Sequence, residues 1–195
     1  MITREKVRPK KVVLEIGSGH APAPFKKDGV AISHDVAEYI AGDISEDNIE
    51  IAQEDLEDLQ RERIGDGFEK MRVVQLDARD LKLSDNSIDE VLCNNLVTVI
   101  KYPVEMAMDA TEKKLLHAES LGKALKEFFR VLKKDGILKI SETIDPAAFL
   151  QYYGSVANFV DMVSSVSDLE FVSSVGEEQV SSGVDRASLS IIFKK

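Results

Sequence analysis

The sequence predicts an α/β fold with a mostly parallel sheet of seven strands, in which the last strand is antiparallel. Strand-like and helix-like segments alternate from residue 11 to about residue 165. Such alternation is typical of right-handed crossovers between parallel strands with helices on both faces. Residues 169–195 then hold two strand-like runs with no helix between them, so we expect the last strand to enter in the opposite direction. No internal repeat or linker divides residues 1–195, which predicts a single domain.

The first strand is predicted at residues 12–16, a short apolar run that contains Glu15 and leads into Gly17 and Gly19. Glycine has no Cβ, so it adopts positive φ and lets peptide N–H groups face a ligand. The same spacing also occurs in ordinary turns. Pro22 and Pro24 oppose an early helix, which predicts irregular structure over residues 20–35.

The second strand is predicted at residues 38–42, and Ser45 is well placed to cap the helix that follows. Apolar residues recur in that helix at spacings of 3, 4 and 3, which indicates an amphipathic stripe: Ile49, Ala52, Leu56 and Leu59. Gly65 and Gly67 are expected to end it.

Residues 71–76 and 87–94 are predicted as the third and fourth strands. A later helix carries Leu121, Leu125, Phe128 and Leu132, and we expect lysines 133 and 134 at its negative end with Gly136 as a left-handed cap. The fifth strand follows at residues 137–140, and another helix is predicted from Pro146 to about residue 166.

Composition restricts the classes of function. The chain has 44% hydrophobic and 31% charged residues, which suits one domain with a large core. Its net charge of −10 argues against non-specific nucleic-acid binding. Residues 1–10 hold a local excess of basic side chains, which predicts a solvated N-terminal arm. No apolar stretch approaches the ~20 residues that span a bilayer, and no signal peptide is recognisable, so we expect a cytoplasmic protein.

Cys93 is the single cysteine, which excludes an internal disulfide and a cysteine-based metal site. It lies in an apolar run, so we expect a buried core residue rather than a nucleophile. No metal site is predicted.

Polar residues mark the ends of four predicted strands. They are Glu15 with Gly17, Ser18 and Gly19 after the first, Asp43 after the second, Asp77 after the third and Asn94 after the fourth. Ligands of parallel α/β sheets bind at the carboxyl ends of the strands, near the switch in strand order. Each residue also has a purely structural interpretation: Glu15 could hold its own loop, Asp43 could cap a helix and Asp77 could close a turn. Their occurrence on one edge, in this order, favours a binding site.

These motifs resemble those of the class I S-adenosylmethionine-dependent methyltransferases over residues 11–145. "VVLEIGSG" is similar to the family's first motif, and "YIAGDIS" to the second-strand motif with its ribose-binding acid. "VVQLDARDLKLSDNSIDEVLCNN" resembles the adenine-site motif and the fourth strand, and "ALKEFFRVLKKDGILKIS" the helix and strand that follow. The resemblance implies a three-layer Rossmann-like sandwich, S-adenosylmethionine as cofactor and S-adenosylhomocysteine as product.

The resemblance also implies roles for individual residues. Gly17, Ser18 and Gly19 would line the methionine and ribose part of the cofactor, and Glu15 would hold that loop. Asp43 would bind the ribose hydroxyls with Ile44 packed on adenine. Asp77 would accept from the adenine amino group beside the Ala78 backbone, and the Asn94 carbonyl would face the methionine amino group. The chain departs from the family at Ala21, where a third glycine is usual, and at the two prolines that follow.

Three other functions are compatible with an α/β fold of this kind. A nicotinamide dehydrogenase would require a glycine where Pro22 stands. An aminopropyl transferase shares the fold, but the chain has no additional acidic motif for a polyamine. A non-catalytic, methyltransferase-like module that binds the cofactor or a partner stays open, because no residue is recognisable as a catalytic base.

Residues 96–118 follow the fourth strand and are longer than a simple connection requires, so we expect a methyl-acceptor site there, for a small molecule or a protein. The catalytic residues and the oligomeric state are not predicted. The histidines and tyrosines near acceptor-side segments are each expected to be packing or surface residues: His20, His34, His117, Tyr102, Tyr152 and Tyr153.

Overall fold

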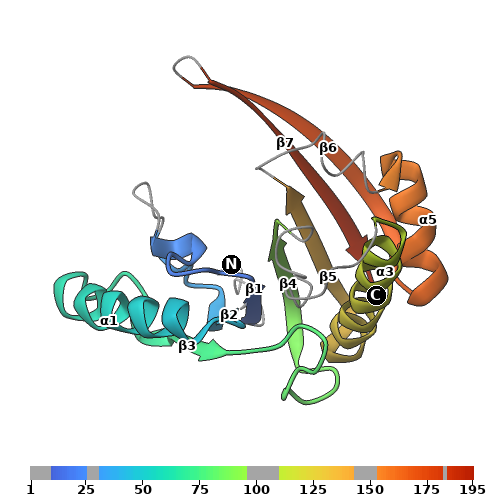
Figure 1. The fold of residues 1–195 in the computed structure, drawn as a ribbon. Helices are drawn as coiled ribbons and strands as arrows, with labels where there is room; N and C mark the ends of the chain where they lie inside the picture. Colours follow the sequence, from blue (N-terminus) through green and yellow to red (C-terminus); the bar gives the residue numbers. More distant parts are fainter. Residues whose placement is uncertain (1–9, 26–30, 96–109, 143–152, 182–183) are drawn as a thin grey trace, which may run out of the picture.

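The computed structural model describes residues 10–25, 31–95, 110–142, 153–181 and 184–195 (Figure 1). One seven-stranded sheet has the order β3-β2-β1-β4-β5-β7-β6. Its strands are β1 (Lys11–Ile16), β2 (Val36–Asp43), β3 (Met71–Gln75), β4 (Ile88–Asn94), β5 (Leu132–Glu142), β6 (Glu170–Ser181) and β7 (Val184–Lys194). The first five strands pair in parallel, and β7 is antiparallel to both β5 and β6. The predicted mostly parallel sheet with an antiparallel last strand is confirmed.

Helices cover the two faces of the sheet and create two separate cores. The helix α1 (Glu46–Glu62) packs on one face, in a cluster that includes Val13 of β1. The helices α3 (Ala110–Val131) and α5 (Val156–Val166) contribute to a larger cluster that includes Leu14. Neighbouring residues of one strand point to opposite faces, so β1 contributes to both cores. The sheet and its two helical layers form the expected three-layer sandwich (Figure 1).

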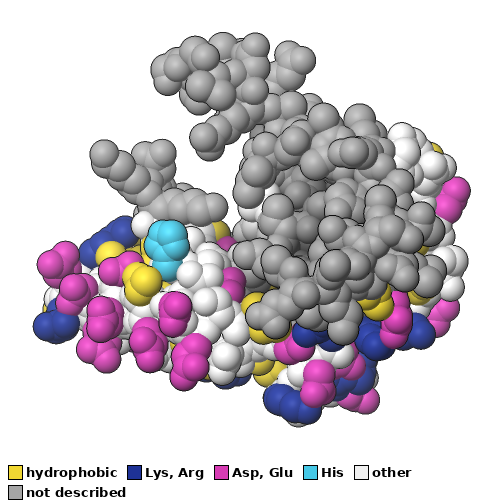
Figure 2. All heavy atoms as spheres, in the orientation of Figure 1, with side chains coloured by type: hydrophobic (Ala, Val, Ile, Leu, Met, Phe, Trp, Pro, Cys, Tyr) yellow, Lys and Arg dark blue, Asp and Glu magenta, His cyan; other side chains and the backbone are white. Residues whose placement is uncertain are grey.

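The helix α1 forms as its sequence predicts. The Ser45 side chain accepts a hydrogen bond from the Asn48 amide, and Ile49, Ala52 and Leu56 are buried. The outward face of α1 is strongly acidic (Figure 2), with exposed carboxylates at Glu46, Asp47, Glu50, Glu54, Asp55, Glu57, Asp58 and Glu62. Much of the negative charge of the chain therefore lies on this helix.

The end of α3 differs from the prediction. The helix ends at Val131, so the two lysines lie beyond it, and Asp135 rather than Gly136 has positive φ, at 65°. A Cβ at Gly136 would lie 2.8 Å from the Lys133 carbonyl oxygen, so glycine is required there for close approach. Lys195 binds the end of α3 instead, since its ammonium donates to the carbonyl oxygens of Phe129 and Leu132 at 2.8 and 2.7 Å.

The prediction of one continuous helix from Pro146 to about residue 166 is wrong, because the helical conformation is interrupted at Gly154 and Ser155. Gly154 has φ 76° and Ser155 is extended, and α5 begins after them at Val156 with the Ser155 side chain as its cap. Its end at Val166 agrees with the prediction. Pro146 itself lies outside the described residues.

Two predicted segments fall wholly or largely outside the described part of the chain. Residues 1–9 of the basic arm are not described, nor are residues 96–109 of the expected acceptor segment, whose remainder forms the first turns of α3. Cys93 is fully buried on β4, as expected. None of the helices in the described ranges combines the length and apolarity needed to cross a membrane. The same ranges contain no cluster of three or more potential metal ligands.

Candidate functional site

The carboxyl ends of β3, β2, β1 and β4 form one edge of the sheet, here called the strand-end rim. Ile16 at the end of β1 pairs with Gly42 of β2 and with Cys93 of β4. Asp43 at the end of β2 pairs with Gln75 of β3. Because these ends are in register, the residues singled out in the sequence lie along the rim in spatial order: Asp77 and Ala78, then Asp43 and Ile44, then Gly17, Ser18 and Gly19, then Asn94. The chain reverses its strand order at β1, where such sheets bind ligands.

The loop after β1 has the predicted glycine conformation but a different set of hydrogen bonds. Gly17 and Gly19 have φ of 71° and 62°. The amides of Gly17 and Ser18 both donate to the Gly42 carbonyl oxygen, at 2.8 and 3.2 Å, so they are directed at β2 rather than outward. The Gly19 amide donates to Asp43 Oδ2 at 2.9 Å. Among the residues that the structure describes, no atom lies within 4 Å of where a Cβ on Gly19 would be.

Glu15 fixes the loop after β1 through hydrogen bonds to its carboxylate. Its side chain is buried, with 1% exposure, and its carboxylate accepts from the Tyr39 hydroxyl at 2.7 Å and from the Ala23 amide at 3.0 Å. The Asn94 side-chain amide donates to the other oxygen at 2.9 Å. Burial, followed by the charge of Glu15, raises the pKa of Tyr39 far above its usual range, so the hydroxyl stays a donor. Glu15 therefore links β1, β2, β4 and the loop. The role expected for the Asn94 carbonyl stays a prediction.

Asp43 connects the ends of β1 and β2. Its Oδ2 accepts from Gly19, and its Oδ1 accepts from the Ser45 amide at 2.9 Å and from the Asn48 side chain at 3.3 Å. Ile44 follows it and is 50% exposed. The Gln75 side chain fixes the backbone there, because it donates to the Ile44 carbonyl oxygen at 3.0 Å. A carboxylate and an apolar surface are thus presented side by side.

Asp77 is paired with Arg79, two residues along the chain. The Arg79 guanidinium contacts both carboxylate oxygens, at 2.8 Å in the shortest contact, and the Arg79 amide donates to Oδ1 at 2.9 Å. The hydrogen bond from the guanidinium lowers the pKa of Asp77, and partial burial opposes that shift. Ala78 between them is 7% exposed and packs in the larger core.

Residues 76–87, which connect β3 to β4 without a helix, are fixed to α3 by Arg130 and Glu127. Arg130 donates to the carbonyl oxygens of Leu81 and Leu83, at 2.7 and 2.8 Å. Glu127 accepts from the Leu81 amide at 2.8 Å and from Arg130. The segment that carries Asp77 therefore rests on a hydrogen-bonded support.

A family model described as a methyltransferase domain matches residues 14–140. The chain belongs to this family. The match runs from β1 into β5, so it includes the ends of all four strands of the strand-end rim. The resemblance to class I S-adenosylmethionine-dependent methyltransferases is confirmed.

Solved structures share this fold at low sequence identity. A SAM-dependent methyltransferase from Methanosarcina mazei has a TM-score of 0.65 and 17% identity, covering 97% of this chain and 94% of that one. One from Aquifex aeolicus has a TM-score of 0.63 and 16% identity, covering 95% and 83%. The YcgJ protein from Bacillus subtilis has a TM-score of 0.60 and 17% identity, covering 97% and 94%. Among curated proteins, no sequence matches significantly. The TM-scores show a common fold.

In this methyltransferase domain, the histidines and tyrosines considered as acceptor-side residues, where the structure describes them, do not converge on the strand-end rim. His117 is 3% exposed, and its Nε2 lies 2.8 Å from the Tyr153 hydroxyl. Tyr153 packs edge-on against Phe159 of α5, at 4.8 Å between ring centroids, so the pair belongs to helix packing. His20 beside the glycine loop and His34 are exposed. Tyr102 and Tyr152 lie outside the described residues.

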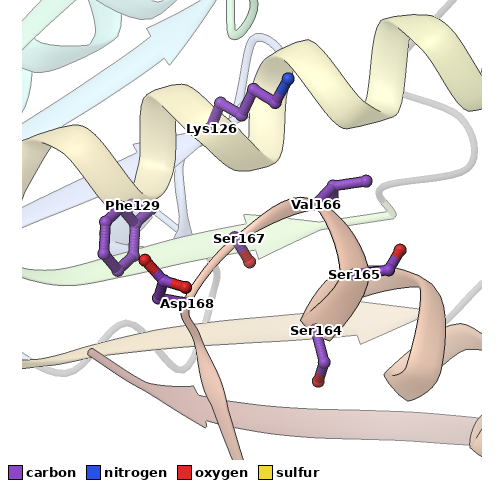
Figure 3. Close-up of a pocket in the computed structure, with 7 residues that line it drawn as sticks. All are labelled: Lys126, Phe129, Ser164, Ser165, Val166, Ser167 and Asp168. Atoms are coloured by element: carbon purple, nitrogen blue, oxygen red, sulfur yellow. The ribbon is translucent and has the colours of Figure 1, made fainter.

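A hollow of about 260 Å³ lies between the ends of α3 and α5 (Figure 3). It is lined by Lys126 and Phe129 of α3 and by residues 164–168. The two helices lead into β5 and β6, which run parallel to β1, so their last turns lie at the edge of the sheet opposite the strand-end rim. In Figure 3 the polar side chains of Lys126 and Ser164 point in opposite directions rather than converging. This hollow is therefore separate from the candidate site.

Three supporting residues were missed in the sequence: Tyr39, Arg79 and Arg130. A tyrosine within a buried strand needs a hydrogen-bond partner, which was a usable signal for Tyr39. An aspartate followed two residues later by a donor is a common turn arrangement, which was a usable signal for Arg79. Arg130 reaches residues 47 and 49 positions away, so no local pattern indicates its role.

Proposed function

We propose that this chain is an S-adenosylmethionine-dependent methyltransferase that transfers a methyl group to a small-molecule or protein acceptor. The observation that carries the proposal is the arrangement of Asp43 and Asp77 on neighbouring strand ends, with the exposed Ile44 after the first and the buried Ala78 after the second. Two carboxylates beside an apolar surface match the polar and flat apolar parts of a nucleoside. Family membership supports the same reading.

The residues present fit such a cofactor. Asp43 is half-buried, and its three donors leave acceptor capacity, since an ionised carboxylate accepts about four hydrogen bonds. Asp43 would bind the ribose hydroxyls, and Ile44 would pack on the adenine ring. Asp77 would accept from the adenine amino group, and the Ala78 backbone would meet the ring. The loop of Gly17, Ser18 and Gly19 would line the methionine part of the cofactor. Glu15 would hold that loop, and the Asn94 carbonyl would face the methionine amino group.

The bound cofactor supplies a methyl carbon that is already activated by the positive charge on its sulfur. The chain then needs to hold the cofactor and the acceptor in line, because correct placement of two reactants can contribute about 7–11 kcal/mol to lowering a barrier. Glu15 and Asp43 serve that end, since they fix the loop after β1 against β2 and β4. A general base is required only for an acceptor that must lose a proton, and we assign none.

The acceptor is proposed to be a small molecule or a protein rather than nucleic acid. The net charge is −10 and the outer face of α1 is acidic, which opposes binding to phosphate backbones. We propose residues 96–118 as the acceptor side, because this segment follows the β4 end of the strand-end rim.

Binding is tested by titration calorimetry with S-adenosylmethionine. Asp43→Asn should weaken the affinity at least tenfold, because hydrogen bonds to a charged group contribute about 1.5–3 kcal/mol. Asp58→Asn is the matched control, since that carboxylate lies on α1 with 67% side-chain exposure and should leave affinity unchanged. Unaltered binding by the Asp43 variant would contradict the placement of the ribose.

Activity is tested with methyl-labelled cofactor and pools of small-molecule and protein acceptors. Transfer of label, with matching release of S-adenosylhomocysteine, would support an enzyme. Tight binding without transfer to any acceptor would instead favour the non-catalytic module.

A further inference from the structure

Arg79 encloses one side of the Asp77 carboxylate. Its Nε donates to Oδ1 at 2.9 Å and to Oδ2 at 3.2 Å, and its Nη2 donates to Oδ2 at 2.8 Å. The Arg79 amide adds a bond to Oδ1 at 2.9 Å. A planar guanidinium that contacts both oxygens fixes the plane of a carboxylate as well as its position. Asp77 therefore has a defined orientation before any ligand binds.

The Asp77 carboxylate has more acceptor positions than Arg79 occupies. An ionised carboxylate has about four acceptor positions, two on each oxygen. The amide and Nε of Arg79 occupy both positions of Oδ1. On Oδ2, Nη2 occupies one, and the longer contact to Nε shares that side. No other described residue occupies the remaining position on Oδ2, and the side chain is 36% exposed, so a ligand donor can reach it.

We propose that Arg79 is a positioning residue for nucleobase recognition: it fixes Asp77 so that the open position on Oδ2 accepts from an exocyclic amino group of a purine. This inference rests on the proposed function and adds a determinant of specificity to it. The buried Ala78 side chain anchors the turn that carries both residues. An ionised carboxylate accepts hydrogen bonds and repels a carbonyl oxygen, so the arrangement selects a 6-amino over a 6-oxo purine. The lowered pKa of Asp77 agrees with this, since it keeps the group ionised.

The experiment compares the dissociation constants of S-adenosylhomocysteine and S-inosylhomocysteine, which differ at position 6 of the base, by calorimetry. The wild-type chain should prefer the adenosyl compound by tenfold or more. Arg79→Ala should weaken adenosyl binding about tenfold, the effect of one hydrogen bond to a charged group, and leave inosyl binding nearly unchanged. The ratio between the two ligands should therefore fall.

Two further variants separate positioning from general effects. Arg72→Ala is the matched control, because Arg72 forms a similar ion pair with Glu38 on the strands β3 and β2, before their carboxyl ends. It should change neither affinity nor ratio. Arg79→Lys retains the charge without the planar fork and should lose part of the preference, and it serves as the folded variant should Arg79→Ala not fold.

The ratio of the two dissociation constants decides between the outcomes. A fall in the ratio for the Arg79 variants, with none for Arg72→Ala, supports the inference. Equal weakening of both ligands, or an unchanged ratio, would overturn it and leave the proposed function standing as long as the wild-type chain binds the adenosyl compound. Failure of the wild-type chain to bind either ligand would overturn the proposed function and the inference together.

Discussion

Tyr39→Phe removes the hydroxyl that donates to the buried Glu15 carboxylate. Tyr39 is 7% exposed and Glu15 is 1% exposed, so water replaces the lost partner poorly. The 2.7 Å bond joins a neutral donor to a charged acceptor, and such bonds contribute about 1.5–3 kcal/mol to the free energy of unfolding. We expect a loss of about 2 kcal/mol, which lowers the melting temperature by about 4–8 °C in a domain of this size.

The pH dependence of stability gives the same variant a second readout. The pKa of Tyr39 in the folded chain lies above its ordinary value of 10.0, because burial and the charge of Glu15 disfavour the phenolate. A group with a raised folded pKa contributes stability that is complete below the unfolded pKa and is lost as pH rises above it. The wild-type chain should therefore lose stability above about pH 10, and Tyr39→Phe should lose less over that window.

The assay is urea unfolding followed by circular dichroism, with Tyr153→Phe as the control. The Tyr153 hydroxyl bonds to an imidazole nitrogen of His117 at 2.8 Å, and loss of such a side-chain hydrogen bond should cost about 1 kcal/mol. A destabilisation by Tyr39→Phe no larger than that of Tyr153→Phe would refute the view that a charged, buried Glu15 depends on this hydroxyl.

Two further substitutions test the supports of the fold. Arg130→Ala should lower the free energy of unfolding by about 2–3 kcal/mol, because two backbone carbonyls of residues 76–87 lose their donor. Arg61→Ala is the control, because the Arg61 side chain is 72% exposed. It should change the free energy of unfolding in urea by no more than about 0.5 kcal/mol. Gly136→Ala should cost about 1–3 kcal/mol by calorimetric melting, because its Cβ would overlap the Lys133 carbonyl. A melting temperature unchanged by Gly136→Ala would mean that the turn rearranges at little cost in free energy.

The sheet and the strand-end rim could be predicted because each strand ends at residues with a local meaning. Asp43 ends β2 and Ser45 caps α1, and both signals are carried by short stretches of sequence. The end of α3 could not be predicted in this way. Gly136 is suited to a left-handed cap, but its position is decided by close approach to Leu132, Lys133 and the Asp89 carbonyl of another strand.

The hydrogen-bond partners within the candidate site could not be predicted from the sequence for a similar reason. Glu15 is bonded to residues 24 and 79 positions away, so its partners are set by the pairing of β1 with β2 and β4. The amides of Gly17 and Gly19 were expected to face a ligand, but the parallel pairing of β1 with β2 places the Gly42 carbonyl beside the Gly17 amide and the Asp43 carboxylate beside the Gly19 amide. Sequence motifs thus indicated where the candidate site lies, while tertiary contacts decide which of its polar atoms already have hydrogen-bond partners.

Leu81 illustrates how an irregular segment becomes rigid. Its amide is bound to Glu127, its carbonyl is bound to Arg130, and its side chain is 2% exposed. Its amide hydrogen should therefore exchange with deuterium only through large-scale opening, as slowly as those of central strands. A segment that is already ordered loses little conformational entropy when a ligand binds beside it. The Asp77 side of the strand-end rim is therefore preorganised without a helix.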